Sequence, residues 1–407
     1  MDCRFCKTVL THEFIDLVNS PASNSFLTEE QLNEPETFYP LRVFTCSNCF
    51  LVQVDEYKKS DAIFNADYVY FSSFSTSWLK HCKAYVDMMT ERFHLGSSSK
   101  VVEIASNDGY LLQYFVEKQI PVLGIEPTKN TAKVAMEKGV RTLTEFFGTR
   151  LAESIEGEEK ADVILGNNVL AHVPDIVDFV GGMKVLLKAD GVVTMEFPHL
   201  LQLIENNQFD TIYHEHFSYL SFYTVKQIFA SQGLELFDVD EIPTHGGSLR
   251  IYAKHVEDGS KTISPNVAAL LTKEEQYGIA NMGYYEGFQA KAKQVKLDLW
   301  QFLIAQSAAG KSVAAYGAAA KGNTLLNYCG IKNDLIQFVV DANPAKQNKF
   351  LPASHIPVVS EQSIKEHKPD FIIIFPWNIQ EEVMTQLSYV KDWGAKFVIP
   401  IPALKII

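Results

Sequence analysis

The stretch KVVEIASNDGYLLQYFVEKQIPVLGIEP, Lys100 to Pro127, decides how the centre of the chain folds. It opens with a short apolar run rich in valine and isoleucine, passes through a polar turn containing glycine, continues as a helical segment and closes with a second apolar run. A strand, a helix and a strand in this order predict two parallel strands joined by a crossover helix. Ligands bind at the carboxyl ends of strands in such sheets, so the turn SNDG lies at a predicted binding edge.

The same alternation extends along most of the chain. The segments TAKVAMEKG, ADVILGNNV and GVVTMEF continue it, and a second series follows from Lys311 with SVAAYGAAAKGNTLLNYCG, IQFVVDA, IPVVS, DFIIIFP and KFVIPI. Residues 265–308 have the pattern of long helices between the two series. We therefore predict an α/β protein with an N-terminal module in residues 1–65, a doubly wound domain in residues 66–260, and a helical linker with a second Rossmann-like domain in residues 261–407.

The turn after the first strand favours S-adenosylmethionine over a dinucleotide. SNDG lacks the G-x-G-x-x-G spacing that lets a pyrophosphate approach a helix N-terminus. Glu126 ends the second strand and can accept hydrogen bonds from both ribose hydroxyls, while Glu145 can reach the adenine amino group. Either carboxylate could instead be an ordinary loop residue, and Phe146 or Phe147 could be core rather than a stacking partner. The predicted cofactor-binding residues are Glu103, Ser106, Asn107, Asp108, Gly109, Glu126, Glu145, Phe146, Asn168 and His172.

Four of the six cysteines form two C-x-x-C pairs, in CRFC and CSNC. Each pair can present two thiolates to one ion, and two pairs supply the four ligands of a structural zinc. Free thiols or a redox-active pair would give the same spacing. The predicted zinc ligands are Cys3, Cys6, Cys46 and Cys49, whereas Cys82 and Cys329 fit small apolar core positions.

The stretch TIYHEHFSYLSFYT, Thr211 to Thr224, gathers side chains that carry chemistry. If it is extended, His214 and His216 share one face and Tyr213 and Glu215 share the other. A metal site would need a third ligand, which the spacing does not provide. An acid–base site needs only a histidine oriented by a partner, with tyrosine hydroxyls to stabilise an oxyanion. Buried aromatic packing is the third interpretation, and Tyr70 and His245 are further candidates for the same pocket.

The turn and helix in SVAAYGAAAKGNTLL indicate a second nucleotide site. Backbone N–H groups at a helix N-terminus and the nearby Lys321 suit a diphosphate. Close packing of small residues would give the same pattern. Asp341 follows the next strand, where either a ribose contact or a turn cap is expected.

The composition is that of a globular protein, with 407 residues of which 47% are hydrophobic. A net charge of -13 without a basic cluster argues against binding to duplex nucleic acid. Neither the start of the chain nor any later stretch has the apolar length of a signal peptide or a membrane span. We expect a cytoplasmic monomer that binds neither nucleic acid nor a membrane.

Taken together, these motifs resemble the three-domain sugar C-methyltransferases of deoxysugar biosynthesis. The resemblance rests, in order along the chain, on CRFC and CSNC, YFSS, VEIASNDG, GIEP, EFF, NNVLAHV, IYHEHFSYLS, HGGSLR, YGAAAKGNTLLNYCGI, DANPAKQN and FPWNIQEE. It implies a zinc module, a central class I methyltransferase fold and a C-terminal Rossmann-like domain. It also implies a thymidine-diphosphate keto-sugar held between the domains.

The resemblance also implies residue roles. His216 matches the base that closes the motif, with Tyr213 and Glu215 beside it, and Tyr70 matches a catalytic tyrosine. Two departures, phenylalanine after Tyr70 where the family has histidine and His214 at a commonly acidic position, concern substrate fit. The expected substrate contacts are His214, His245, Arg250, Tyr316, Lys321 and Asn323.

A ketone at C4 makes the C3 proton of the sugar acidic, so a base can create a carbon nucleophile for the methyl group. An O- or N-methyltransferase acting on a sugar nucleotide would need no such enolate. A NAD-dependent sugar dehydrogenase or a regulatory nucleotide-binding protein would also account for the second nucleotide site.

Overall fold

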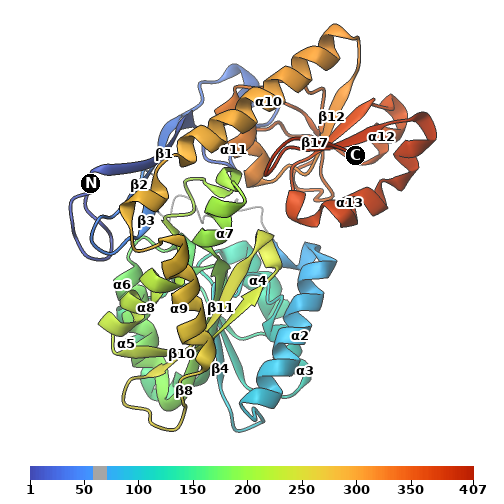
Figure 1. Ribbon diagram of the computed structural model, residues 1–407. Coiled ribbons are helices and arrows are strands. Elements are labelled where there is room, and N and C mark those ends of the chain that lie inside the picture. The colour runs from blue at the N-terminus through green and yellow to red at the C-terminus, as the bar shows by residue number, and fades with distance from the viewer. Residues whose placement is uncertain (58–70) are drawn as a thin grey trace.

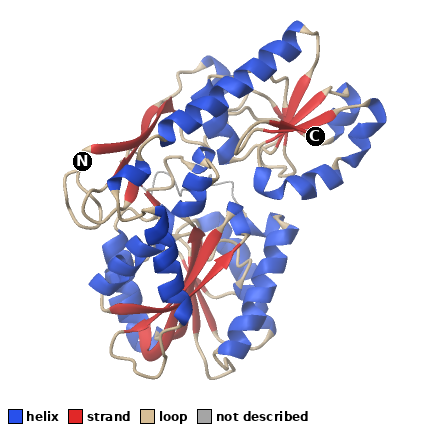
Figure 2. Cartoon of the chain, in the orientation of Figure 1, coloured by secondary structure: helices blue, strands red, loops and turns tan. Residues whose placement is uncertain are grey.

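The computed structural model describes residues 1–57 and 71–407 and contains three β-sheets. Figure 1 shows the N-terminal sheet and the C-terminal domain side by side above the larger central domain, with the chain termini in the upper two parts. The secondary-structure view in Figure 2 shows helices flanking the central and C-terminal sheets, as the alternating sequence pattern predicts.

The central sheet has seven strands in the order β10-β11-β8-β7-β4-β5-β6. The strands are β4 (Val101–Ile104), β5 (Val122–Ile125), β6 (Thr142–Leu143), β7 (Ala161–Asn167), β8 (Leu187–Pro198), β10 (Leu234–Ile242) and β11 (Ser248–His255). Strands β4 to β8 are parallel, and β11 pairs antiparallel with both β8 and β10. The chain winds outward in opposite directions from β4 and β7, so the gap between these strands is the switch point at which ligands bind.

Helices cover both faces of this sheet, α5, α6, α8 and α9 on one and α2, α3 and α4 on the other (Figure 1). Their bounds are α2 (Thr76–Arg92), α3 (Leu112–Glu117), α4 (Lys129–Glu137), α5 (Thr149–Glu159), α6 (Ile176–Leu186), α8 (Phe222–Ser231) and α9 (Pro265–Tyr277). Ser75 caps α2 by accepting a hydrogen bond from the N–H of Trp78. The short α7 (Leu200–Glu205) follows β8 and leads toward the C-terminal domain.

The C-terminal sheet has six strands in the order β14-β13-β12-β15-β16-β17. Its elements are β12 (Val313–Tyr316), α11 (Ala320–Cys329), β13 (Val339–Val340), β14 (Val358–Val359), α12 (Gln362–His367), β15 (Phe371–Ile374), α13 (Gln380–Gln386), β16 (Lys396–Ile399) and β17 (Lys405–Ile406). All pairs are parallel except that of β16 with β17. The switch point lies between β12 and β15, and Gly317 is required there because a Cβ would lie 2.5 Å from Cδ of Pro376.

The N-terminal sheet is completed by a strand from the central part of the chain. It consists of β1 (His12–Ser20), β2 (Tyr39–Thr45), β3 (Val52–Val54) and β9 (Ser218–Tyr219), all paired antiparallel. Strand β9 comes directly after the histidine-rich segment of residues 211–217. The N-terminal module therefore holds one end of that segment.

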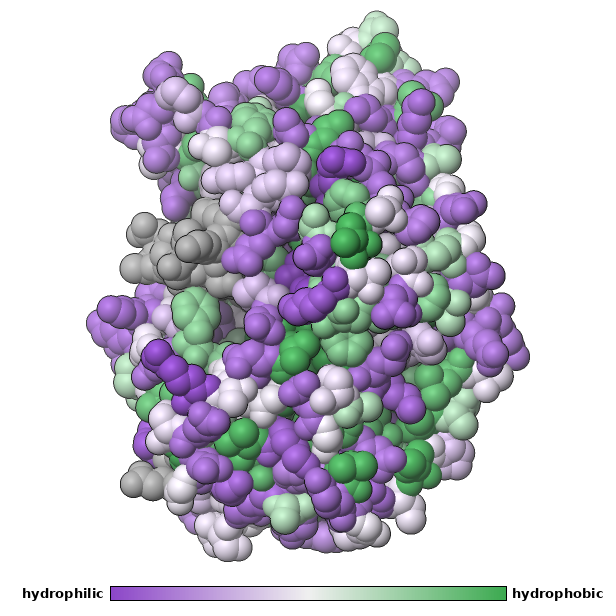
Figure 3. All heavy atoms as spheres, turned by 90° about the vertical axis from the view of Figure 1, so that its left-hand side faces the viewer, coloured by the Kyte–Doolittle hydropathy of each residue, from purple (hydrophilic) through white to green (hydrophobic). Residues whose placement is uncertain are grey.

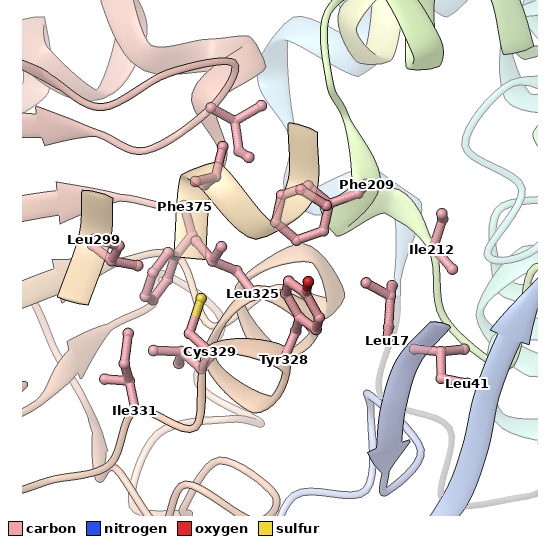
Figure 4. Close-up of a cluster of buried hydrophobic side chains, with 14 of the residues drawn as sticks. Leu17, Leu41, Phe209, Ile212, Leu299, Leu325, Tyr328, Cys329, Ile331 and Phe375 are labelled. Atoms are coloured by element: carbon pink, nitrogen blue, oxygen red, sulfur yellow. The ribbon is translucent and has the colours of Figure 1, made fainter. Parts of the chain in front are cut away.

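A single hydrophobic core joins the N-terminal sheet to the C-terminal domain. Helix α10 (Phe288–Ala308) lies across both, and Phe288 stacks on Phe14 of β1 with ring centroids 4.6 Å apart. Figure 4 shows Phe209, from the segment before residue 211, beside Leu325 and Tyr328 of α11. On the face drawn in Figure 3, hydrophobic side chains are interspersed with hydrophilic ones, as is usual for a protein surface.

Candidate active site

A cavity of about 610 Å³ opens at the carboxyl ends of the central strands. Its wall includes the loops after β4, β5 and β7, the segment of residues 211–216, the turn at His245, and the loops after β12 and β15. The switch points of two doubly wound sheets therefore face the same space. The predicted residues that line it are Asn107, Glu126, Glu145, Phe146, Asn168, His172, Tyr213, Glu215, His216, His245 and Lys321.

The loop after β4 forms a tight polar cradle. Ala105, Asn107 and Gly109 all have left-handed backbones, with φ of 59°, 47° and 73°. Glu126 fixes the loop because its carboxylate accepts hydrogen bonds from the N–H of Asn107, at 3.0 Å, and of Thr128, at 2.8 Å. Burial raises the pKa of Glu126, while those hydrogen bonds oppose the rise.

Several predicted cofactor residues support this cradle from behind and do not line the cavity. Ser106 is fully buried, and the carboxylate of Asp108 pairs with Nζ of Lys138 at 3.2 Å. Glu103 is also fully buried, and burial raises its pKa well above the ordinary value. Gly109 lies within the turn of residues 107–110 and packs against Ala135 of α4. At the opposite rim Glu145 and Phe146 are exposed toward the cavity.

The segment of residues 211–216 is a turn, so the expectation of an extended strand is wrong. The N–H of His216 donates to the carbonyl of Tyr213 at 3.0 Å, which brings these two side chains to the same side. The Tyr213 hydroxyl lies 2.8 Å from Nε2 of His216, and the ring centroids are 4.0 Å apart. His214 turns away, and its Nε2–H donates to the carbonyl of Pro40 at 3.2 Å. The pairing of His214 with His216 on one face, and the metal site it allowed, are therefore not found.

Hydrogen bonds define the protonation of His216 in this turn and of His172, which lies beside it in the segment after β7. Nδ1–H of His216 donates to the carbonyl of Thr211 at 2.9 Å, which leaves Nε2 to accept from Tyr213. Nδ1–H of His172 donates to the carbonyl of Glu215 at 2.7 Å, and the two imidazole centroids are 4.6 Å apart. Burial lowers the pKa of His216 well below the usual value and that of His172 to about 4. Both rings are therefore neutral at pH 7.

Cationic side chains lie on the C-terminal side of the cavity. Nζ of Lys321, at the start of α11, is 4.1 Å from the centre of the Trp377 ring and donates to Oδ1 of Asn378 at 2.8 Å. Burial lowers the pKa of Lys321 to about 8, although the Asp210 carboxylate opposes the shift. Asp210 accepts a hydrogen bond from Nε1 of Trp377 at 2.7 Å. Lys346 also lines this part of the wall.

Four predicted substrate residues lie outside the cavity wall. His214 is buried against the N-terminal module, and Nδ2 of Asn323 donates to the carbonyl of Ser23 at 2.6 Å. The Tyr316 hydroxyl bonds Gln386 at 3.1 Å. Nε of Arg250 donates to Glu196 at 2.7 Å in a buried ion pair. The predicted catalytic residue Tyr70 lies outside the described residues.

Other wall residues were not predicted. Asn167 ends β7 and is 8% exposed, and neither atom of its amide has a hydrogen-bond partner among the described residues. Its position at the end of a predicted strand, directly before Asn168, could have identified it. Trp78 and Lys346 reach the wall through tertiary packing, and no local pattern in the sequence indicates this.

The four predicted zinc ligands form one cluster. Their sulfur atoms all lie within 4.8 Å of one another, with Cys3 3.5 Å from Cys49 and Cys6 3.4 Å from Cys46. A tetrahedral zinc with Zn–S bonds of ~2.3 Å requires sulfur separations of ~3.8 Å, so the cluster fits the ion. Nε2 of Gln53 donates to Sγ of Cys3 at 3.2 Å, which is the kind of second hydrogen-bonding layer that orients a metal ligand.

Comparison with known proteins agrees with this architecture. Three family models match the chain: a zinc-binding domain at residues 3–64, a methyltransferase domain at residues 79–239 and the C-methyltransferase C-terminal domain at residues 243–402. The C-methyltransferase NovU of Streptomyces niveus is 34% identical over 407 residues, which is 100% of this chain and 96% of NovU.

Two other matches are partial. A ubiquinone biosynthesis O-methyltransferase of Rhodopseudomonas palustris (strain BisA53) is 29% identical over 24% of this chain and 38% of its own. The magnesium protoporphyrin IX methyltransferase of Synechocystis PCC 6803, solved with bound SAM, aligns with 44% of this chain and 81% of its own, at 13% identity and a TM-score of 0.34.

Within the described residues, none of the helices combines the length and the apolar character needed to cross a bilayer. The full-length match and the three consecutive domain models give the same assignment. The chain belongs to the C-methyltransferase family and is an S-adenosylmethionine-dependent methyltransferase.

Proposed function

We propose that this enzyme methylates C3 of a nucleotide-diphosphate 4-keto-6-deoxysugar, with His216 as the base. The observation that carries the proposal is the Tyr213–His216 pair, a hydroxyl 2.8 Å from the unprotonated nitrogen of a neutral imidazole, inside the cavity between the cofactor cradle and the lysines. A carbon acceptor needs both a base and an oxyanion donor, and this pair supplies one of each.

Proton removal begins with the Nε2 lone pair of His216. Its Nε2 accepts the Tyr213 hydroxyl when no substrate is present, so the hydroxyl must turn toward the sugar before Nε2 can take the C3 proton. The hydrogen bond from Nδ1–H to the Thr211 carbonyl holds the ring in the tautomer that this step requires. The low pKa of His216 keeps it in the basic form, and a nearby dianionic substrate would strengthen it as a base.

The electrons of the C3–H bond spread onto the C4 oxygen, where they need a donor. The rotated Tyr213 hydroxyl can donate to this oxygen, and Tyr70 is a second proposed donor. Loss of one such donor typically costs ~2.7–4 kcal/mol of barrier. A bound S-adenosylmethionine would supply the methyl group to C3, with its C–S bond breaking as the C–C bond forms. His216 keeps the proton until solvent removes it.

The cofactor cradle fits a bound S-adenosylmethionine, which supplies an electrophilic methyl group. Glu126 has oxygen lone pairs left for the ribose hydroxyls after accepting two backbone N–H groups. Glu145 and Phe146 stand at the rim on the adenine side, and the amide of Asn167, which has no hydrogen-bond partner in the part of the chain that the structure describes, lies nearer the centre of the sheet. The proposed cofactor residues therefore include Asn167 in addition to those expected from the sequence.

The lysines fit the diphosphate of the substrate. Lys321 stands at the first turn of α11, where backbone N–H groups also favour an anion, and Lys346 lies on the same wall. In a chain with a net charge of -13, these are the local cations that an anionic ligand requires. Four cysteine ligands leave no open position, so the proposed zinc is structural.

The decisive experiment is mass spectrometry of thymidine-diphosphate 4-keto-6-deoxyglucose in deuterated water, with and without S-adenosylmethionine. We expect enzyme-dependent uptake of one deuteron without the methyl donor, and gain of a methyl group with it. His216→Asn should lose both reactions while keeping its melting temperature and its affinity for S-adenosylhomocysteine. A fully active His216→Asn enzyme would overturn the base assignment, and absence of both reactions in the wild type would overturn the substrate assignment.

A further inference from the structure

The turn between β10 and β11 holds a histidine in an uncommon backbone conformation. His245 has φ of 57° and ψ of 20°, in the left-handed region that only a few per cent of non-glycine residues occupy. The glycines that follow leave little freedom: a Cβ on Gly246 would lie 2.4 Å from the Trp377 ring, and one on Gly247 would lie 2.6 Å from Gln202. Backbone strain of this kind persists only where the surrounding structure enforces it.

The imidazole of His245 lines the cavity without a hydrogen bond to any described residue. Its Nδ1 is buried and has no hydrogen-bond partner in residues 1–57 and 71–407. Burial, followed by the charge of Lys321, lowers the pKa of His245 to about 4, while Glu196 opposes and His81 adds to the shift. The ring is therefore neutral at pH 7, with one N–H to donate and one lone pair to accept. A half-buried group of this kind is costly unless a ligand or water completes it.

A chain of contacts fixes the imidazole from behind. The Trp78 and His245 rings meet edge to face, with centroids 5.4 Å apart and an interplanar angle of 77°, and Trp78 stacks on His81 at 5.0 Å and 17°. Nε2 of His81 bonds Glu196 at 2.8 Å. The other oxygen of Glu196 binds the guanidinium of Arg250, at 2.7 Å from Nε and 2.6 Å from Nη2. This buried cluster gives Arg250 a role that the sequence did not indicate.

We propose that His245 binds a hydroxyl group of the substrate's sugar ring and that Trp78, His81, Glu196 and Arg250 are positioning residues for it. This inference rests on the proposed function. A neutral imidazole complements a hydroxyl, which both donates and accepts, whereas a phosphate only accepts and is better matched by the neighbouring Lys321. The His245 ring contacts Trp78, which lines the same cavity as Asn107 and Glu126, and the next residue, Gly246, packs against Trp377, the ring that Lys321 covers. The sugar is the part of the substrate that must occupy this position.

The test compares His245→Gly and His245→Asn, both of which tolerate the left-handed backbone. We expect His245→Gly to lower kcat/KM for the keto-sugar nucleotide, and the rate of deuterium uptake at subsaturating substrate, by on the order of tenfold. His245→Asn, which keeps a donor and an acceptor, should recover part of the loss. Affinities for S-adenosylhomocysteine and for thymidine diphosphate, which lacks the sugar, should not change.

The matched control is His94→Gly, because His94 is an exposed histidine with φ of 51° outside the cavity wall. It should change none of these quantities. Wild-type kinetics in His245→Gly would overturn the assignment. An equal loss of affinity for thymidine diphosphate would also overturn it, because it would mean that His245 contacts a phosphate and not a sugar hydroxyl. A wild-type enzyme that exchanges no deuterium would instead refute the proposed function. Trp78→Phe should give a smaller loss in the same direction if Trp78 positions the ring.

Discussion

Replacement of Lys321 with arginine should move the alkaline limit of substrate capture to higher pH. Lys321 stands over the Trp377 ring, and burial lowers its pKa to about 8. If its charge holds the diphosphate, kcat/KM must fall as the pH rises through that value, because kcat/KM reports ionisations of the free enzyme. Arginine stays charged up to a pH of ~12, so kcat/KM of the variant should not show this alkaline fall, or alkaline limb, of the pH profile.

The size of the effect follows from the pKa. A group with a pKa of about 8 is ~90% protonated at pH 7 and ~10% protonated at pH 9, so kcat/KM of the wild type should fall about tenfold between these values. The Asp210 carboxylate, whose pKa burial raises to about 6, is ionised throughout this range and adds no limb. His216 is neutral throughout, since its pKa is shifted well below the ordinary value.

Initial rates of methyl transfer at low substrate, measured from pH 7 to 10, give the profile directly. Arginine does not reproduce the geometry of lysine, so the shape of the profile is informative and its absolute height is not. Lys311→Arg is the control, because Lys311 pairs with Asp370 at the surface, and its profile should match the wild type. An alkaline limb that persists unchanged in Lys321→Arg, or a wild-type profile that is flat to pH 10, would refute the reasoning.

Three further predictions concern the zinc cluster, the turn at Gly246 and Asn167. Removal of the metal by a chelator should lower the melting temperature and abolish deuterium uptake, while the affinity for S-adenosylhomocysteine should change by no more than a few-fold. If metal analysis shows complete loss of zinc and deuterium uptake survives, the N-terminal module does not hold the segment of residues 211–217 in place. Gly246→Ala should destabilise the fold by ~1–3 kcal/mol in thermal unfolding because its Cβ would meet Trp377 at 2.4 Å, whereas Gly259→Ala, with no atom within 4 Å, should not. Asn167→Leu should lower the affinity for S-adenosylhomocysteine, measured by calorimetry, yet leave the free protein as stable or more so, because a buried amide without partners costs ~1–3 kcal/mol; unchanged affinity would contradict the role given to Asn167.

Local sequence patterns predicted those parts of the fold that depend on residues close together in the sequence. The apolar run at Val101–Ile104, the polar turn after it and Glu126 at the end of the next strand are where the βαβ pattern predicts them. The two C-x-x-C pairs likewise predicted one cluster, because each pair is a local turn and zinc needs four ligands. Fold class and cofactor edge could therefore be read from the sequence.

The rest depended on tertiary contacts. Alternation cannot distinguish an extended segment from the turn at Tyr213–His216, which is held by the Thr324 hydroxyl donating to the carbonyl of Ile212 at 2.8 Å. The family resemblance made Arg250 an expected substrate contact, yet its guanidinium pairs with Glu196, which lies opposite it on the neighbouring strand. Such long-range pairs leave no mark on local periodicity.

The position of the proposed base gives the two extra domains a role beside the methyltransferase fold. The central sheet provides the cofactor edge, but the segment that bears His216 is fixed from the other two sides. The N–H of Val54 in the N-terminal module donates to the carbonyl of Phe217 at 3.1 Å, and Trp377 of the C-terminal domain donates to Asp210 at 2.7 Å. Deprotonation of carbon tolerates little misplacement of the base, since reacting atoms must approach to ~3–3.5 Å. In the proposed mechanism, the two added domains therefore act on the geometry of proton removal as well as on substrate binding, and loosening either should reduce exchange at C3 before it affects cofactor affinity.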